Sequence, residues 1–173
     1  RRRGPRSMAA ARRLPSFVPS FVPSASQPTA AQLDALSALI LQSRTLLAIT
    51  GAGISTHSGI PDYRSPQGSY SRGHRPIQHT EFVKDEFMRT RYWARSFVGW
   101  EFFSRASPNP AHVALAMLEA HGHLTGGLIT QNVDGLHEAA GSKHFIDLHG
   151  RIDTVECLGC GDLSRRDALQ DRI

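Results

Sequence analysis

A glycine-containing segment directly follows the first short apolar run of the chain and is a candidate phosphate-binding turn. Glycines at such a point let backbone amides approach a phosphate, and the start of a helix behind them favours negative charge. Thr56 stands where a dinucleotide-binding motif would place its third glycine, and no strand with a ribose-binding acid follows about 20 residues later. Nucleotide binding and a plain tight turn are both open for this segment, whose candidate contacts are Gly51, Ala52, Gly53 and Ser55.

Two more polar clusters could contact a ligand. The first, residues 59–64, is a rigid turn that presents an acid, a ring and a guanidinium, which could hold a sugar, a cationic ring and a phosphate; a salt bridge within a solvated loop is the alternative. The second follows an apolar run at 128–130, and ligands of open α/β sheets bind beyond the carboxyl ends of strands. An ordinary helix cap by Asp134 is the alternative there. The candidates are Ile60, Asp62, Tyr63 and Arg64 in the first cluster and Gln131, Asn132, Val133 and Asp134 in the second.

His149 is the candidate general base. It ends a third apolar run, so its side chain is expected near the other two strand ends, and histidine is the usual base at neutral pH. The chain has nine histidines, so most of them have ordinary roles. We expect His112 and His137, which lie in predicted helices, to satisfy local hydrogen bonds.

Cys157 and Cys160 have the spacing of half a tetrahedral zinc site. A redox-active pair is the alternative, but it would be followed by a helix, whereas Gly161 indicates a knuckle turn. Zinc needs two more ligands, and no later cysteine is present in these 173 residues. Two cysteines in this length exclude a disulfide scaffold.

The elements that must position these residues alternate between strands and helices, which predicts a parallel α/β sheet. The expected strands are residues 46–50, 128–130 and 145–148, and the expected helices are residues 29–42, 109–122 and 134–140. Residues 51–79 are predicted to be mainly a long functional loop. Residues 80–103 are predicted to be helical, and most of their aromatic rings are expected to pack in the core.

The composition of 173 residues, 40% hydrophobic and 20% charged, suits one globular domain, and no apolar run is long enough for a transmembrane helix. Residues 1–33 hold six arginines and no acid, whereas 14 basic and 15 acidic residues follow, so the body shows no charge signature of nucleic-acid binding. The arginine-rich, serine-rich arm at 1–28 is typical of an organelle transit peptide, with an untargeted disordered arm as the alternative.

Five motifs in this order resemble the sirtuin family of NAD-dependent protein deacylases. They are Gly-Ala-Gly-Ile-Ser from residue 51, Gly-Ile-Pro-Asp-Tyr-Arg from residue 59, Gln-Asn-Val-Asp from residue 131, Leu-His-Gly from residue 148 and the Cys-x-x-Cys pair. They lie within residues 46–161. Tyr63 and the segment at 91–100 are similar to the mitochondrial sirtuin-4 branch, which implies a location in the mitochondrial matrix.

The resemblance implies a role for each candidate residue. NAD would be the co-substrate: its pyrophosphate and neighbouring ribose would contact Gly51, Ala52, Gly53 and Ser55. The loop around the nicotinamide ribose would contain Ile60, Asp62, Tyr63 and Arg64. Gln131 and Asn132 would contact that ribose and an ordered water, Val133 and Asp134 would line the carboxamide pocket, and His149 would accept the proton. Cys157 and Cys160 would be two of four structural zinc ligands.

The family's reaction moves the acyl group of acyl-lysine proteins to ADP-ribose with release of nicotinamide, and a different nucleophile at the same carbon would give ADP-ribosyl transfer. The family implies a Rossmann-like parallel sheet with helices on both faces at 29–150, including a loop and helical insert at 51–103, and the start of a zinc-binding module at 151–173. We expect the chain to be an N-terminal fragment with an incomplete sheet, inactive alone. A catalytically silent NAD-binding or partner-binding protein is the alternative.

Overall fold

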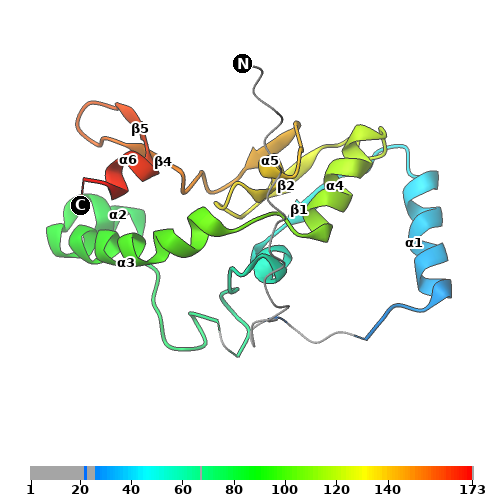
Figure 1. Ribbon diagram of the computed structural model, residues 1–173, viewed down its shortest axis with the longest axis horizontal. Helices are drawn as coiled ribbons and strands as arrows, with labels where there is room; N and C mark the ends of the chain where they lie inside the picture. The colour runs from blue at the N-terminus through cyan, green and yellow to red at the C-terminus, as the bar shows by residue number, and fades with distance from the viewer. Residues whose placement is uncertain (1–21, 23–25, 67, 173) are drawn as a thin grey trace, which may run out of the picture.

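The computed structural model describes residue 22, residues 26–66 and residues 68–172 (Figure 1). The interpretation of residues 1–28 as a targeting arm therefore falls almost entirely outside the described part. Within that part, no helix is both long enough and apolar enough to cross a bilayer.

Three short parallel strands form the central sheet, in the order β1 (Ala48–Thr50), β2 (Leu128–Thr130) and β3 (Phe145–Asp147). Thr50 pairs with Thr130, and Thr130 pairs with Asp147, so the three carboxyl ends lie level with one another. The predicted parallel α/β sheet is confirmed. Its level strand ends bring three distant polar segments to one edge.

The two faces of the sheet differ in how they are covered. On one face Leu128 and Thr130 are buried, and Thr50 bonds to His137 of the short helix α5 (Leu136–Ala139). On the other face Ile49 and Ile146 are 65% and 58% exposed among the described residues. The polar network of the site lies on the covered face.

Helix ends follow the capping signals of the sequence. Thr29 forms a capping box before α1 (Ala30–Gln42), and Asn109 caps α4 (Pro110–Ala120), which has proline at its first position. Gly122 follows α4 with a positive φ of 74°, the left-handed conformation that commonly ends helices. These boundaries agree closely with the predicted ones.

The region after β1 contains more regular structure than predicted. Residues Ala52–Ser58 form a 3-10 helix, η1, and only the stretch that follows it is a long loop. The aromatic segment is two helices, α2 (His79–Lys84) and α3 (Glu86–Arg105), because the carboxylate of Asp85 accepts hydrogen bonds from the amides of Phe87 and Met88 and so starts a new helix. The aromatic rings of α3 are not a fully buried core, since no residue of this helix is buried.

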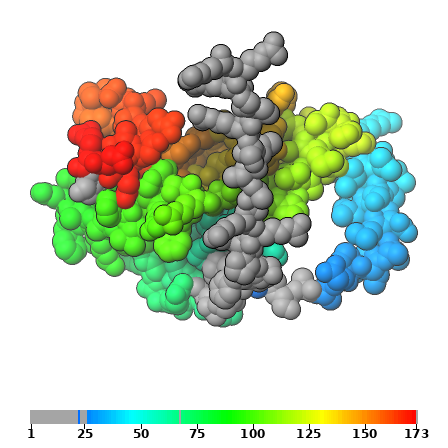
Figure 2. Space-filling model, viewed as in Figure 1, coloured from blue at the N-terminus to red at the C-terminus, as the bar shows by residue number. Residues whose placement is uncertain are grey.

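The C-terminal segment is a separate small unit. Strands β4 (Thr154–Glu156) and β5 (Leu163–Arg165) pair antiparallel and lead into α6 (Arg166–Gln170), which packs beside α3 (Figures 1 and 2). The guanidinium of Arg166 lies 5.5 Å from the Trp93 ring centroid and 5.1 Å from that of Trp100. Arg166 is only 1% exposed, and a hydrogen bond from Gln170 Nε2 to the Phe97 carbonyl at 3.2 Å also joins α6 to α3.

Candidate active site

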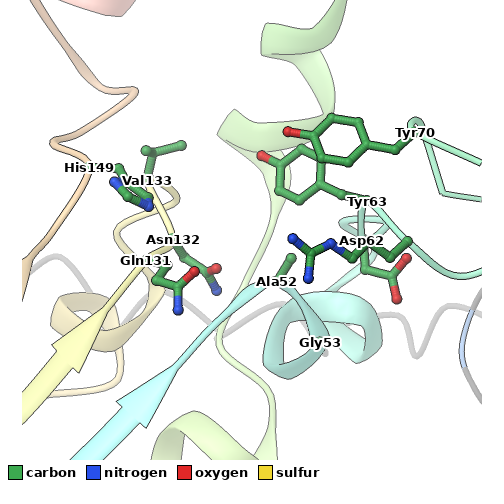
Figure 3. A pocket seen from close by; sticks show the side chains of 10 residues that line it. Ala52, Gly53, Asp62, Tyr63, Tyr70, Gln131, Asn132, Val133 and His149 are labelled. Carbon is green, nitrogen blue, oxygen red and sulfur yellow. The ribbon is translucent and has the colours of Figure 1, made fainter. Parts of the chain in front are cut away.

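The ends of β1, β2 and β3 converge on one cavity of about 510 Å³. Figure 3 shows Gln131, Asn132, Val133 and His149 on one side of it, and Tyr63 and Tyr70 on the other. The sequence predicted this convergence, and nine of the ten lining residues are predicted site residues. The lining residues are Ala52, Gly53, Asp62, Tyr63, Arg64, Tyr70, Gln131, Asn132, Val133 and His149.

Buried hydrogen bonds hold the turn after β1 against the loop after β2. The hydroxyl of Ser55 donates to Asp134 Oδ2 at 2.6 Å, and Asn132 Nδ2 donates to Ser55 Oγ and to the Gly51 carbonyl, both at 3.1 Å. Ser55 is 1% exposed and Asn132 9% exposed. These side chains therefore fix the geometry of the cavity floor before any ligand binds.

Asp134 makes the predicted contact at the helix start and also bonds to the turn after β1. Its Oδ1 accepts a hydrogen bond from the Leu136 amide at 3.0 Å, which is the helix-cap interaction, while its Oδ2 accepts from Ser55. Asp134, Ser55 and the buried Ile60 line an adjoining cavity of about 270 Å³. That cavity shares Ala52, Asp62, Tyr63, Asn132 and Val133 with the first.

Asn109, at the start of α4, holds η1 in place through side-chain hydrogen bonds. Asn109 Nδ2 donates to the Ile54 carbonyl at 2.6 Å and to Ser58 Oγ at 3.0 Å, while its Oδ1 caps α4. Asn109 is 7% exposed. Sequence reasoning identified this residue only as a helix cap, because its second set of contacts joins segments more than 50 residues apart.

His112 and His137 are buried beside this network, with ring centroids 4.9 Å apart. His137 Nε2 bonds to Thr50 Oγ1 at 2.9 Å, so the expectation that this histidine satisfies only local hydrogen bonds is wrong. Burial lowers the pKa of His137 to about 4, helped by the nearby His112 and opposed by Asp134. Burial also lowers the pKa of His112, so both rings are neutral at pH 7.

The loop after η1 forms the opposite wall. Asp62 accepts a hydrogen bond from the Ser65 amide at 2.9 Å, and the side-chain and backbone hydrogen bonds of Ser65 lower the pKa of this carboxyl. No ion pair joins Asp62 to Arg64 among the described residues, so the salt-bridge alternative is not supported. The Arg64 guanidinium can meet an anionic ligand group.

Two tyrosine rings stack at the mouth of the cavity. Tyr63 and Tyr70 have centroids 5.1 Å apart at an interplanar angle of 28°. Desolvation by burial, with neighbouring Tyr70 and Asp134, raises the pKa of the Tyr63 hydroxyl. Sequence reasoning missed Tyr70, and the available signal was a second tyrosine seven residues after Tyr63 in a loop otherwise poor in large rings.

The cavity has the chemistry of a site for a polar, anionic ligand with a sugar. Gly53 lines it, and a Cβ added there would meet no protein atom within 4 Å, so the packing of the protein itself does not require glycine. A bare backbone at this position leaves room for a ligand to approach closely. A dinucleotide phosphate fits such a turn, with Arg64 as counter-charge and His149 able to accept a proton.

Cys157 and Cys160 lie outside this cavity, in the β4–β5 connection. The Gly161 amide donates to the Cys157 carbonyl at 2.8 Å, and Gly161 has a φ of 74°, so the predicted knuckle turn is confirmed. Both thiols are exposed, and backbone N–H groups of Cys160 and Gly159 lower the pKa of the Cys157 thiol. This geometry suits half of a zinc site; no cluster of three or more metal-binding side chains occurs in the described residues.

Comparisons with known proteins give a consistent result. Residues 51–173 match the sequence profile of the Sir2 family. A protein of Arabidopsis thaliana, "NAD-dependent protein deacylase SRT2", is 51% identical over 153 residues, which are 88% of this chain and 40% of that protein. The Homo sapiens protein "NAD-dependent protein lipoamidase sirtuin-4, mitochondrial" is 51% identical over 155 residues, which are 88% of this chain and 49% of that protein.

Solved structures agree with the sequence matches. A mutant Sir2 with a deacetylated p53 peptide and 3′-O-acetyl-ADP-ribose superposes with a TM-score of 0.72 at 34% identity, covering 81% of this chain and 56% of that one. The chain thus spans about half the length of the relatives it matches.

Proposed function

The chain belongs to the Sir2 family, and from this membership we propose that its protein is an NAD-dependent protein-lysine deacylase. The reaction would transfer the acyl group of an acyl-lysine to ADP-ribose and release nicotinamide. The observation that carries the proposal is the cavity itself, in which the glycine turn after β1, the amides after β2 and His149 after β3 line one space.

We propose that NAD lies along this cavity. NAD would supply the ADP-ribosyl acceptor and nicotinamide as the leaving group. The backbone of Ala52 and Gly53, at the N-terminal end of η1, would face its pyrophosphate, with Arg64 as a counter-charge. Gln131 and Asn132 would donate and accept hydrogen bonds at the ribose, and the Asn132 side chain is held in place by its hydrogen bond to Ser55.

His149 would act as the general base. It lies at the end of β3 and lines the same cavity as Gln131 and Asn132. The imidazole there would take a proton from a ribose hydroxyl, so that the oxygen can attack the acyl carbon. Tyr63, at the cavity mouth, would shield the ribose carbon from water after nicotinamide departs.

A nicotinamide-release assay on a panel of acyl-lysine peptides tests the proposal, using protein made from the complete reading frame. Peptide-dependent nicotinamide release together with loss of the acyl group would support deacylation. Release that leaves ADP-ribose on a protein would indicate ADP-ribosyl transfer instead. Binding of NAD without any release would contradict the proposal and favour the silent NAD-binding alternative.

We further propose a structural zinc site and a division into modules. Cys157 and Cys160 would supply two of four thiolate ligands, supported by their exposure and the knuckle turn between them. Residues 29–150 would form the NAD-binding domain, with the insert at 51–103, and residues 151–173 would begin the zinc-binding module. The β4–β5 pair is a sheet separate from the central one, which supports this boundary.

Residues 1–28 would direct the protein to the mitochondrial matrix. The arm has arginines and serines and no acid, and two similar proteins are named as mitochondrial. Fusing residues 8–33 to a fluorescent reporter tests this proposal. A diffuse cytosolic signal would contradict it.

A further inference from the structure

The loop that carries Tyr63 folds back on itself, and Tyr70 lies at the point of return. The Tyr70 amide donates to the Tyr63 carbonyl at 2.9 Å, and Ser71 Oγ donates to the Arg64 carbonyl at 3.0 Å. A Cβ at Gly68 would overlap the backbone of Tyr63 and Arg64, so only glycine permits this close return. Two chain segments thus support each other where the cavity opens.

The rings continue this backbone pairing. Tyr70 stacks on Tyr63 with centroids 5.1 Å apart, and in Figure 3 both hydroxyls point toward the side of Val133 and His149. Tyr63 is 49% exposed and Tyr70 39% exposed, so neither ring is held in place by the core. The stack on Tyr70 is therefore a contact that can orient the Tyr63 ring.

We propose that Tyr70 is a positioning residue for this reaction: by stacking on Tyr63 it keeps that ring at the cavity mouth and so limits attack by water on the ribose carbon. The proposal rests on the function proposed above. It assigns a role to a residue outside the five sequence motifs.

The competing reaction defines what Tyr70 should control. In hydrolysis of NAD, the glycosidic carbon–nitrogen bond breaks, the oxygen of water bonds to the ribose carbon, and a proton goes to solvent. Nicotinamide is then released without any lysine being deacylated. The ratio of nicotinamide released to lysine deacylated therefore reports how well the site excludes water.

The experiment measures this ratio, with kcat and KM for NAD, in protein from the complete reading frame and its variants. Tyr70→Ala and Tyr70→Leu remove the ring, and Tyr70→Phe keeps it. Stacking of two aromatic rings changes the equilibrium constant for ring placement by about two- to tenfold. We therefore expect Tyr70→Ala and Tyr70→Leu to raise the ratio of nicotinamide released to lysine deacylated by a similar factor. Tyr70→Phe should leave it close to that of the unmodified protein.

Phe87→Ala serves as the matched control, because it removes an aromatic ring that is 70% exposed at the start of α3. Tyr63→Ala serves as the positive control and should raise the ratio at least as much as Tyr70→Ala. Thermal unfolding of each variant separates a local effect from misfolding. The Leu variant leaves a smaller cavity than the Ala variant does and so covers the case in which Ala folds poorly.

Two results would overturn the proposal. One is an unchanged ratio in Tyr70→Ala and Tyr70→Leu while Tyr63→Ala raises it, which would show that Tyr63 needs no support from Tyr70. The other is a rise of the ratio in Tyr70→Phe equal to that in Tyr70→Ala, which would assign the role to the Tyr70 hydroxyl instead of the ring stack. Absence of nicotinamide release from the unmodified protein is a different failure, since it refutes the proposed function itself.

Discussion

The hydroxyl of Ser55 donates a 2.6 Å hydrogen bond to Oδ2 of Asp134, which ties the turn after β1 to the loop after β2. Both segments line the candidate site, and the strands before them are neighbours in the sheet. The site is therefore held together by a contact that buries a hydroxyl against a carboxylate. Such a hydrogen bond to a charged group contributes more to stability than one between neutral groups.

Ser55→Ala should weaken both stability and NAD binding, because it leaves the Asp134 carboxylate and the Asn132 amide without their shared partner. We expect a loss of about 1–3 kcal/mol in the free energy of unfolding. Urea unfolding and calorimetric titration with NAD measure the two effects, and Ser104→Ala on the exposed surface of α3 is the control. If the double variant Ser55→Ala/Asp134→Asn loses the sum of the unfolding free energies that the two single variants lose, the two side chains are not directly coupled.

His149→Ala should reduce deacylation by about 10²- to 10⁴-fold, the usual contribution of a general base. The side chain is exposed, so folding and zinc content should not change. Turnover with an acyl peptide, together with thermal unfolding and metal analysis, checks this expectation. His121→Ala, which changes an exposed histidine after α4, is the matched control, and activity retained by His149→Ala would reject its role as base.

The strand ends and most of the site were predictable because local signals specify them. Short apolar runs ended by glycine or polar residues define β1, β2 and β3, and in a parallel sheet their carboxyl ends must share one edge. The shared edge of the strand ends is sufficient to predict that His149 lies near Gln131. Caps at Thr29 and Asn109 fixed two helix starts for the same local reason.

The remaining features depend on tertiary contacts that no local pattern specifies. His137 meets Thr50 only because α5 packs on the covered face of the sheet, 87 residues from its partner. Tyr70 stacks on Tyr63 because Gly68 allows the loop to fold back on itself. The helix η1 is held in place by Asn109, at the start of α4, which donates a hydrogen bond to the Ile54 carbonyl. In each case the sequence shows the type of the residue but does not indicate which distant residue it contacts.

Changing Cys157 or Cys160 to serine should remove bound zinc and destabilise the β4–β5 hairpin. We expect each variant to lose most of the metal, because serine is a poor ligand for zinc in a thiolate site. Elemental analysis of the purified protein measures the metal, and chelator-induced unfolding measures its contribution to stability. Leu158→Ser changes an exposed residue of the same turn and is the control; zinc retained by both cysteine variants would contradict the site.

Stability should fall as the pH drops from about 6.5 toward about 4, because the pKa of the buried His137 is lowered from 6.5 to about 4. In this window the unfolded chain binds a proton that the folded protein excludes, so the destabilisation is absent above about 6.5 and grows to its full size near 4. The shift corresponds to about 3 kcal/mol. The groups facing the ring are His112, Asp134 and Thr50. Urea unfolding across this range should show a smaller slope for His137→Gln, and an equal slope would contradict the assignment.

Arg166→Ala should loosen the contact of the C-terminal unit with α3, because its guanidinium lies over the rings of both Trp93 and Trp100. Its Nε and Nη1 atoms are buried without hydrogen-bond partners in the described residues, so the charge is held by the rings and by a 3.4 Å bond from Nη2 to Ser96 Oγ. We expect a loss of about 1–3 kcal/mol. Arg166→Met should retain most of the stability, since it fills the space without an unpaired buried charge. These two tryptophans are the only ones in the chain, so their fluorescence reports the contact directly, and an unchanged spectrum in Arg166→Ala would show that α6 docks by other means.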